Sequence, residues 1–465
     1  MRKKLLSLLL LLLPVISFAQ EKEENMDEMW GSDKVSVEVL RAGKGKLFDQ
    51  SNFGMFIHWG LYALPARHEW VMSNEKMSKK TYEKYANYFD PDLYNPTQWA
   101  KLAKKAGMKY VVFTAKHHDG FTMYDSKYTD YKVTNTPYGK DVMKELVDAF
   151  RAEGIRIGLY YSLIDWHHPD FLVKDPIHPE KNNTKELAKD SSRDLKKFQK
   201  YLKNQLTEIL TNYGQIDILF ADFSYPQKEN GKGKAYWNSE DLYQQIRKLQ
   251  PQIIINDRLD LREEGGWDFM TPEQFMPKEW VTYKGEKVPW ETCQTFSGYS
   301  WGYHRDDHSW KSTEQTIVML IETVSKGGNL LLNVGPTARG IIQAEAVDRL
   351  EATHQWMKYH DRSIYGCTAA PEKFKKPDNC LLTYNPKTNR LYVHVLEWPF
   401  KTIYLPGLAD KVAYAQILND GSELKLKTKK GAWLDDVKSD DNGLTITIPV
   451  TKPDVEIPVI ELILK

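Results

Sequence analysis

Polar residues able to do acid, base or sugar-binding chemistry follow several apolar, strand-like runs of this chain. The run 110–113 is followed by Lys-His-His-Asp (116–119), and "IDILFAD" (216–222) ends in Asp222. A run of β-branched and aromatic residues predicts a strand that is buried on both faces. Polar groups at its end are costly to bury unless they are paired or contact a ligand. We therefore expect these groups to meet at one functional site.

The other candidates lie close to the ends of predicted strands, except one that opens its strand. With Asp222, the candidates are His58, Glu69, Trp70, His117, His118, Tyr161, Phe220, Arg258, Glu273 and, at the start of its strand, Glu291. A lone Asp or Glu among them is better explained as a cap, a turn residue or half of a salt bridge, and a lone histidine as a structural residue. Because side chains alternate along a strand, Phe220 and Asp222 share a face, and only one of His117 and His118 follows the inward set.

Two chemistries use histidines and carboxylates in this way. Metal-assisted hydrolysis holds zinc with His and Asp, and barrels of that kind present a His-x-His pair on the first strand. Here the first strand has one histidine and the pair at 117–118 is adjacent, which weakens this alternative. Glycoside hydrolysis requires an ionised carboxylate and a protonated carboxyl at the scissile bond. Histidine and arginine would then hold ring hydroxyls, and aromatic rings would cover the apolar face of the sugar.

Strand-like and helical segments alternate along the part of the chain that carries these residues. The candidate strands are 54–60, 109–118, 155–162, 216–222, 252–257, the vicinity of 268–273, 291–296 and 329–336. The helical patterns are 96–107, 141–154, about 185–213, 239–250, which opens with a capping-box spacing, and 312–328. Eight strands alternating with helices predict an α/β fold, a (β/α)8-like TIM barrel. A doubly wound sheet is the alternative, but no glycine-rich loop follows the first strand.

The ends of the chain have a different texture. Residues 1–20, "MRKKLLSLLLLLLPVISFAQ", combine a basic start, a short apolar run and small residues at cleavage spacing, which predicts a signal peptide. We expect export to a periplasm or the extracellular space, without a membrane anchor. Residues 21–365 would form the catalytic barrel. Residues 366–465 are short alternating runs, which predict a C-terminal antiparallel β-sandwich domain.

Composition excludes some partners. The formal net charge is +1, so nothing favours nucleic acid or anionic membranes. Only three cysteines occur, so the chain is not a disulfide scaffold. Cys367 and Cys380 could pair, leaving Cys293 free, and the sequence does not decide this. No cysteine or histidine spacing indicates structural zinc.

Several motifs, in order, resemble glycoside hydrolase family 29, the α-L-fucosidases. They are "FGMFIHWGLYALPARHEW", "WAKLAKKAGMKYVVFTAKHHDGF", "IDILFAD", "NDR", "WETCQTFSGYSWGY" and "GGNLLLNVGP". The resemblance covers about residues 50–365 and implies a catalytic barrel followed by a β-sandwich. It also implies an exo-acting, retaining hydrolase that releases L-fucose from a fucosylated glycan and needs no cofactor.

The resemblance implies roles for the candidates. Asp222 would be the nucleophile, and Glu273 the acid/base, with Glu291 as the second choice. Roles in binding the sugar fall on His58, Glu69, Trp70, His117, His118, Tyr161 and Arg258, and Phe220 could pack on the sugar. Here Phe220 and Phe223 flank the nucleophile segment where many relatives have other residues, which bears on aglycone preference. A silent sugar-binding protein is the non-enzymatic alternative. The linkage, the natural glycan and the oligomeric state stay open.

Overall fold

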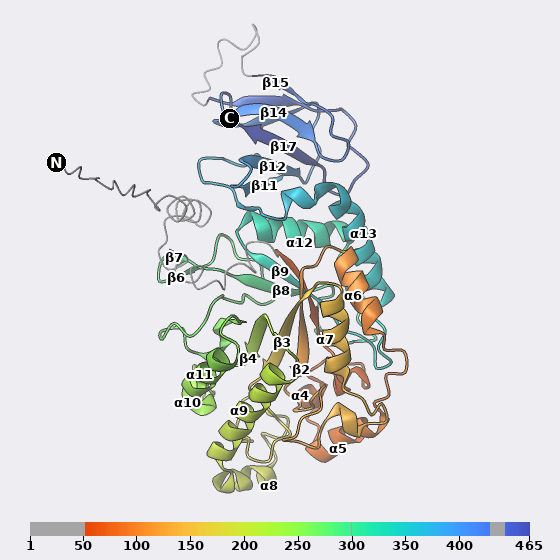
Figure 1. Cartoon of the computed structure of the whole chain (residues 1–465), viewed down its shortest axis with the longest axis vertical. Coiled ribbons are helices and arrows are strands. Elements are labelled where there is room, and N and C mark those ends of the chain that lie inside the picture. The colour runs from red at the N-terminus through yellow and green to blue at the C-terminus, as the bar shows by residue number, and fades with distance from the viewer. Residues whose placement is uncertain (1–51, 299, 428–441) are drawn as a thin grey trace, which may run out of the picture.

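The structure is a computed structural model that describes residues 52–298, 300–427 and 442–465. The predicted signal peptide at 1–20 lies outside the described residues. Figure 1 shows a lower part in which strands and helices alternate and an upper part made of strands. The elements of the lower part carry the candidate residues.

A parallel sheet of seven strands forms the centre of the lower part, within the described residues. In sheet order the strands are β5 (Ile254–Ile255), β4 (Ile218–Asp222), β3 (Arg156–Ser162), β2 (Tyr110–Lys116), β1 (Phe53–Ile57), β9 (Asn329–Val334) and β8 (Glu291–Thr295). Because β9 returns beside β1, the chain order is that of a barrel. The TIM-like fold predicted from the alternating pattern is confirmed.

Residues 268–273 lie between the two ends of this sheet. Phe269 bridges Asn256, next to β5, and Glu273 bridges Cys293 of β8, both in parallel. The sixth predicted strand is therefore not a regular strand. Its isolated bridges on both sides nevertheless continue the barrel wall and bring Glu273 beside β8.

Alternate residues of the strands face two different cores. Tyr110 and Val112 of β2 pack inside the barrel with Phe56. Val111 and Phe113 lie on the other face, in the larger core between the sheet and the helices. This two-sided burial explains the nearly continuous apolar runs in the sequence.

Helices cover the outside of the sheet (Figure 1). They are α6 (Pro96–Lys105), α7 (Val142–Ala152), α9 (Leu195–Thr211), α11 (Ser239–Leu249), α12 (Thr313–Ser325) and α13 (Ala344–His360), with the shorter α4 (Val71–Asn74), α5 (Lys79–Glu83), α8 (Thr184–Leu187) and α10 (Lys234–Trp237). Asn95 and Asp141 cap α6 and α7 by accepting backbone N–H groups of the first turn. Gly107 follows α6 with φ +94°, a conformation that favours glycine.

Two helix predictions need correction. The long helix expected at about 185–213 is divided into α8, a 3-10 turn and α9, because Asp194 accepts the N–H groups of Lys196 and Lys197 and starts a new helix. The capping box expected at Ser239 does not form. Asn238, at φ 55°, precedes α11 without a side-chain cap bond.

The upper part contains antiparallel strands, as predicted. In the described residues one sheet holds β10 (Thr368–Ala369), β11 (Cys380–Asn385), β12 (Arg390–Val395), β17 (Val459–Leu464) and β14 (Val412–Ile417), and another holds β13 (Thr402–Leu405), β16 (Leu444–Thr447) and β15 (Lys425–Lys427). A hairpin, β6 (Thr282–Tyr283) and β7 (Glu286–Lys287), belongs to the barrel region. Leu391 of β12 and Ile446 of β16 share one core, so the two sheets pack face to face.

The three cysteines, all in the described part, are buried free thiols, so Cys367 and Cys380 are not paired. Across the described residues, no helix has both the length and the apolar character needed to span a membrane.

Candidate active site

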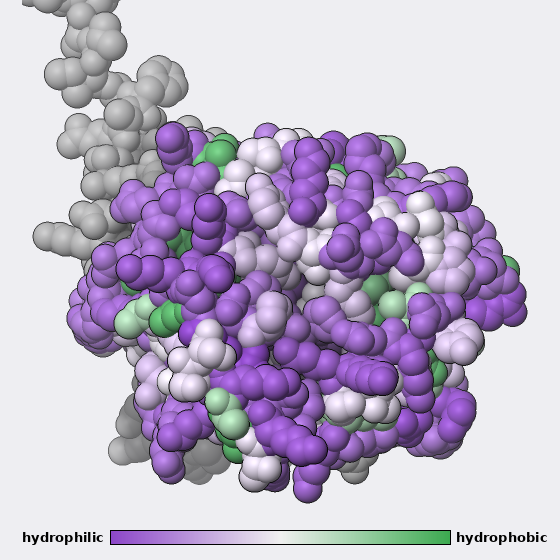
Figure 2. Space-filling view, turned by 90° about the horizontal axis from the view of Figure 1, so that it is seen from below, coloured by the Kyte–Doolittle hydropathy of each residue, from purple (hydrophilic) through white to green (hydrophobic). Residues whose placement is uncertain are grey.

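A pocket lies at the carboxyl ends of the barrel strands, where barrel chemistry is expected. Its lining includes most of the candidates and is formed by Phe56, His58, Trp70, His117, His118, Tyr160, Phe220, Asp222, Phe223, Arg258, Glu273, Cys293 and Trp301. Figure 2 views the molecule from the end that carries the loops after these strands, and this surface is mostly hydrophilic.

Arg258 joins the two candidate catalytic carboxylates. Its Nη1 lies 2.6 Å from Oδ1 of Asp222, the last residue of β4, and its Nη2 lies 2.8 Å from Oε2 of Glu273. Tyr160 donates its hydroxyl hydrogen to Oδ2 of Asp222 at 2.7 Å. A single guanidinium therefore separates the carboxylates, which is compatible with the roughly 5–5.5 Å spacing of retaining glycosidases. The Asp222 side chain is 9% exposed and that of Glu273 is 41% exposed.

The hydrogen-bond network fixes the tautomer of His58. Asn333 donates its amide Nδ2 to the carbonyl of Trp301 at 2.7 Å, so its Oδ1, 2.7 Å from Nδ1 of His58, is the acceptor. Nδ1 of His58 thus carries the hydrogen, and Nε2 remains an acceptor. Burial lowers the pKa of His58 to about 3, so the ring is neutral at pH 7.

The adjacent histidines both line the pocket. Ser162 donates to the carbonyl of Ile164 at 2.8 Å, so its oxygen accepts Nδ1–H of His118 at 2.7 Å. Nε2 of His118 is then an acceptor, 3.9 Å from Oδ2 of Asp222. Burial, and then the charges of Lys116 and Arg258, lower the pKa of His118 to about 3.

The His117 ring stacks on Tyr160 with centroids 5.7 Å apart. Burial lowers the pKa of His117 well below its usual range. Its Nδ1 has no partner among the residues that the structure describes. Because β2 ends at Lys116, both histidines follow the strand, and both line the pocket.

Aromatic rings form two walls. Phe56 lies between Phe220 and Trp301, with centroid distances of 5.2 and 5.8 Å. Trp70 and Phe223 form the second wall, 5.9 Å apart. Flat apolar rings beside charged and hydrogen-bonding groups suit a sugar, which has both kinds of surface.

Tyr161 does not line the pocket, which corrects the expectation. Parallel pairing places Tyr160 opposite Phe220, on the pocket face, so the next residue points outward. The Tyr161 hydroxyl donates to Oε1 of Gln205 on α9 at 2.7 Å. Tyr160 is the tyrosine that contacts Asp222.

Glu291 also lies away from the pocket. It is the first residue of β8, at the end of the strand opposite the pocket, and it is 1% exposed. The Tyr110 hydroxyl donates to its Oε2 at 2.5 Å. Burial raises the pKa of Glu291 to about 8. Its placement disfavours an acid/base role.

Glu69 lies beside the pocket and supports one of its walls. Its Oε2 accepts the backbone N–H groups of Trp301 at 2.9 Å and Gly302 at 3.0 Å and the Ser300 hydroxyl at 2.9 Å. The carboxylate thus fixes the segment that presents the Trp301 ring. From the sequence, Glu69 itself was expected to contact the sugar.

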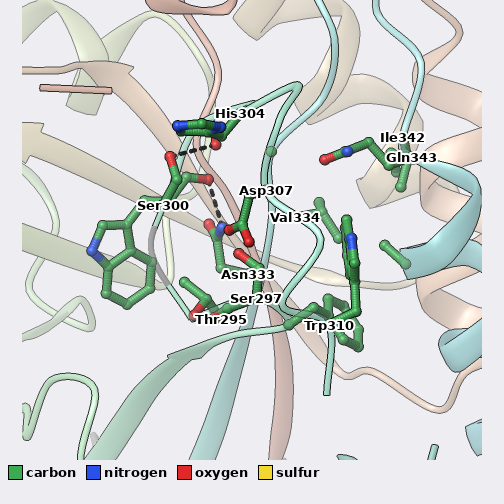
Figure 3. Close-up of a pocket in the computed structure, with 15 residues that line it drawn as sticks. Thr295, Ser297, Ser300, His304, Asp307, Trp310, Asn333, Val334, Ile342 and Gln343 are labelled. Atoms are coloured by element: carbon green, nitrogen blue, oxygen red, sulfur yellow. Dashed lines mark hydrogen bonds between the residues drawn. The ribbon is translucent and has the colours of Figure 1, made fainter. Parts of the chain in front are cut away.

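A second cavity, drawn in Figure 3, shares a lining residue with the pocket. Trp301 and Asn333 line it, and Trp301 also lines the first pocket. The Asn333 amide in this view bonds the Trp301 carbonyl (Figure 3). Asn333 therefore connects the Trp301 segment to His58.

Sequence reasoning did not select several lining residues. They are Phe56, Tyr160, Phe223, Cys293 and Trp301. The alternation of side chains along a strand contained a signal for Tyr160. In β4, Phe220 and Asp222 face the pocket, and Tyr160 of the neighbouring β3 pairs with Phe220. Trp301 lies within the quoted motif 290–303, but its place in the pocket depends on Glu69, 232 residues earlier.

Among the described residues, no three His, Cys, Asp or Glu side chains are grouped so that they could hold a metal ion. The Asp222 and Glu273 carboxylates in the pocket are instead arranged around Arg258.

Comparisons with known proteins agree on one family. The Alpha-L-fucosidase family model matches residues 18–362. The chain is 29% identical to the alpha-L-fucosidase of Dictyostelium discoideum, covering 87% of this chain and 89% of that protein, and 30% identical to human plasma alpha-L-fucosidase, covering 86% and 85%.

Solved structures give the same result. Alpha-L-fucosidase isoenzyme 1 from Paenibacillus thiaminolyticus has a TM-score of 0.84 and 43% identity, covering 91% of this chain and 99% of its own. A family 29 alpha-L-fucosidase from Bacteroides thetaiotaomicron, trapped as a covalent intermediate with 2-fluoro-fucosyl fluoride, has a TM-score of 0.77 and 29% identity, covering 91% and 96%. This chain therefore belongs to glycoside hydrolase family 29, the α-L-fucosidases.

Proposed function

We propose that the pocket removes terminal L-fucose from fucosylated oligosaccharides or glycoconjugates, with Asp222 as nucleophile and Glu273 as acid/base. The observation that carries this assignment is the pair of carboxylates held on the two terminal nitrogens of Arg258, at 2.6 and 2.8 Å. The covalent intermediate trapped in the Bacteroides relative supports the same double displacement.

In the first step, an oxygen of Asp222 attacks the anomeric carbon. The glycosidic C–O bond breaks, and Glu273 gives its proton to the leaving oxygen. In the second step, Glu273, now a carboxylate, takes a proton from water. The water oxygen attacks the anomeric carbon, the ester bond to Asp222 breaks, and fucose leaves with its original configuration. The greater exposure of Glu273 suits a group that meets a leaving group reaching toward solvent.

The neutral histidines act as acceptors for sugar hydroxyls in this proposal. Nε2 of His58 and Nε2 of His118 are free to accept, because their Nδ1 hydrogens are already bound. The methyl group of fucose would contact Trp70 or Phe220 on the aromatic walls. A silent sugar-binding protein is disfavoured, since both candidate carboxylates line the pocket.

We extend the proposal to organisation and location. Residues 21–365 would form the catalytic part and residues 366–465 the sandwich. The first 20 residues would direct export to a periplasm or the extracellular space.

The test is hydrolysis of an aryl α-L-fucoside by the purified mature protein, beside Asp222→Gly with and without azide. We expect the variant to lose activity and azide to restore it, giving β-fucosyl azide. If the wild type cleaves neither the aryl fucoside nor fucosylated oligosaccharides, the proposed function is wrong. If azide gives the α product, Asp222 is not the nucleophile.

A further inference from the structure

A buried ion pair lies just outside the fucose pocket, on the far side of the sheet. Nζ of Lys116, the last residue of β2, is 3.2 Å from Oδ2 of Asp165, and the side chains are 0% and 1% exposed. The ammonium lies 4.4 Å from the centre of the Tyr161 ring, and Tyr201 donates its hydroxyl hydrogen to Oδ2 of Asp165 at 3.0 Å. Burying two charges costs free energy that their attraction often does not recover. The presence of the Lys116–Asp165 ion pair therefore calls for a reason other than stability.

An irregularity in β2 explains why Lys116 points outward. Thr114 pairs with Tyr160 on the pocket face, but Lys116 pairs with Tyr161 on the outer face, so the register shifts at Ala115. Regular alternation would have turned Lys116 into the pocket. Bulges of this kind re-aim side chains next to active sites. Here the shift removes a cation from the pocket, and His117 follows on the pocket side.

Asp165 connects this cation to the histidine segment. Its Oδ1 accepts the backbone N–H groups of His167 at 3.1 Å and His168 at 2.8 Å, which fixes the turn after β3. Within that turn, Trp166 donates its backbone N–H to the carbonyl of His118 at 2.8 Å, and its ring lies 5.5 Å from the His118 ring.

Gly120, which follows the His117–Asp119 segment, also lies against Asp165. Its φ is +79°, and a Cβ there would lie 2.1 Å from Oδ1 of Asp165. The Asp165 carboxylate therefore touches the chain on both sides of the segment His117–Asp119.

We propose that Lys116 and Asp165 are positioning residues for the fucose pocket: their ion pair fixes the His117–His118 segment against the turn that carries Trp166. The inference rests on the proposed role of these histidines in binding fucose. Neither residue lines the pocket, so both act through the backbone of His118 and the ring of Trp166.

The charges are consistent with this arrangement. Burial raises the pKa of Asp165, but the Lys116 ammonium and the neighbouring histidines more than reverse this, and the net pKa is about 2. The groups that face His118 are Lys116 and His117 beside it, Asp222 on β4 and Arg258 after β5. Removing the Lys116 charge would therefore let His118 take up a proton at higher pH.

The test replaces both charges together, because a single change would leave one charge buried alone. Lys116→Met/Asp165→Asn is compared with Lys232→Met/Asp175→Asn, a second buried ion pair with side chains 2% and 0% exposed that does not line the pocket. The readouts are kcat/KM for an aryl α-L-fucoside, Kd for L-fucose, the pH profile and the melting temperature.

We expect the first double variant to lose at least tenfold in kcat/KM and in fucose affinity, with its acidic limb moved to higher pH. The control should stay within about twofold of the wild type. Wild-type kinetics in the first variant, or equal losses in both, would overturn the proposal. An inactive wild type would instead count against the proposed function.

A milder pair of variants covers the case in which the double variant does not fold. Tyr201→Phe removes one hydrogen bond to Asp165, whereas Tyr161→Phe removes a bond to Gln205 only. We expect a severalfold loss of kcat/KM in Tyr201→Phe and none in Tyr161→Phe. The same kinetics in both variants would overturn the proposal.

Discussion

The position of Glu273 leads to a prediction that separates the two acid/base candidates. Glu273→Gln keeps the shape of the side chain and an oxygen for Arg258, now 2.8 Å away, but removes the transferable proton. General acid–base catalysis contributes about 10²–10⁴ in rate, or about 3–5 kcal/mol at 1.36 kcal/mol per decade. We expect a loss of this size in kcat/KM for a fucoside with a poor leaving group.

The matched control is Glu291→Gln. Glu291 is 1% exposed at the far end of β8, and its raised pKa of about 8 keeps it protonated at pH 7. A glutamine there is neutral as well and still accepts the Tyr110 hydroxyl. We expect less than a tenfold loss in kcat/KM.

The assay compares an aryl fucoside whose leaving group needs no protonation with one that does, each with and without azide. In Glu273→Gln the activated substrate should form the fucosyl-enzyme readily, and azide should release it as α-fucosyl azide, because azide attacks the intermediate without a general base. If Glu291→Gln shows the large loss and the azide rescue while Glu273→Gln stays within tenfold, the assignment of Glu273 is refuted.

Three further results are expected. Tyr160→Phe removes a hydrogen bond to the Asp222 carboxylate, which is worth about 1.5–3 kcal/mol, so kcat/KM should fall roughly 10- to 150-fold while Tyr161→Phe changes it little; equal kinetics would contradict the placement of these rings. Because the pKa of Glu291 is raised, the native state holds its proton between pH 4.5 and about 8 while the unfolded state has lost it, so this group destabilises the fold as pH rises. Relative to the wild type, Glu291→Gln should gain about 1.4 kcal/mol of unfolding free energy per pH unit across that window. Denaturant unfolding at pH 5 and pH 7.5 measures this, and the same difference between variant and wild type at both pH values would contradict it. EDTA should leave hydrolysis unchanged, and a loss restored by zinc would favour the metal-dependent alternative.

The barrel was predictable because its signals are local. Each strand is a short apolar run, and helices such as α6 and α7 begin at a capping Asn or Asp and are followed by glycine. The segment 268–273 was harder, since it forms only isolated bridges and its place in the wall depends on neighbours on both sides. The break before α9 carried a local signal in Asp194, which favours a helix start over a helix interior.

The site was predictable where strand ends decided it. Asp222 ends β4 and lies in the pocket, and Glu291 starts β8 and lies at the opposite end, so strand direction alone distinguishes them. Glu69 could not be assigned in this way. Its partners include backbone groups more than 230 residues further along the chain, and no pattern in the sequence specifies that contact.

The adjacent histidines show why strict alternation fails at a functional site. Two neighbouring residues on a regular strand cannot face one pocket, so a chain that needs both there must leave the strand conformation before them. In β2 the register shifts at Ala115 and the strand ends at Lys116. That irregularity turns Lys116 outward, into a region where only a buried partner makes its charge tolerable, and Asp165 is that partner. The polar end of an apolar strand thus has two causes: His117 and His118 line the pocket, and Lys116 forms the buried ion pair that we propose holds them there.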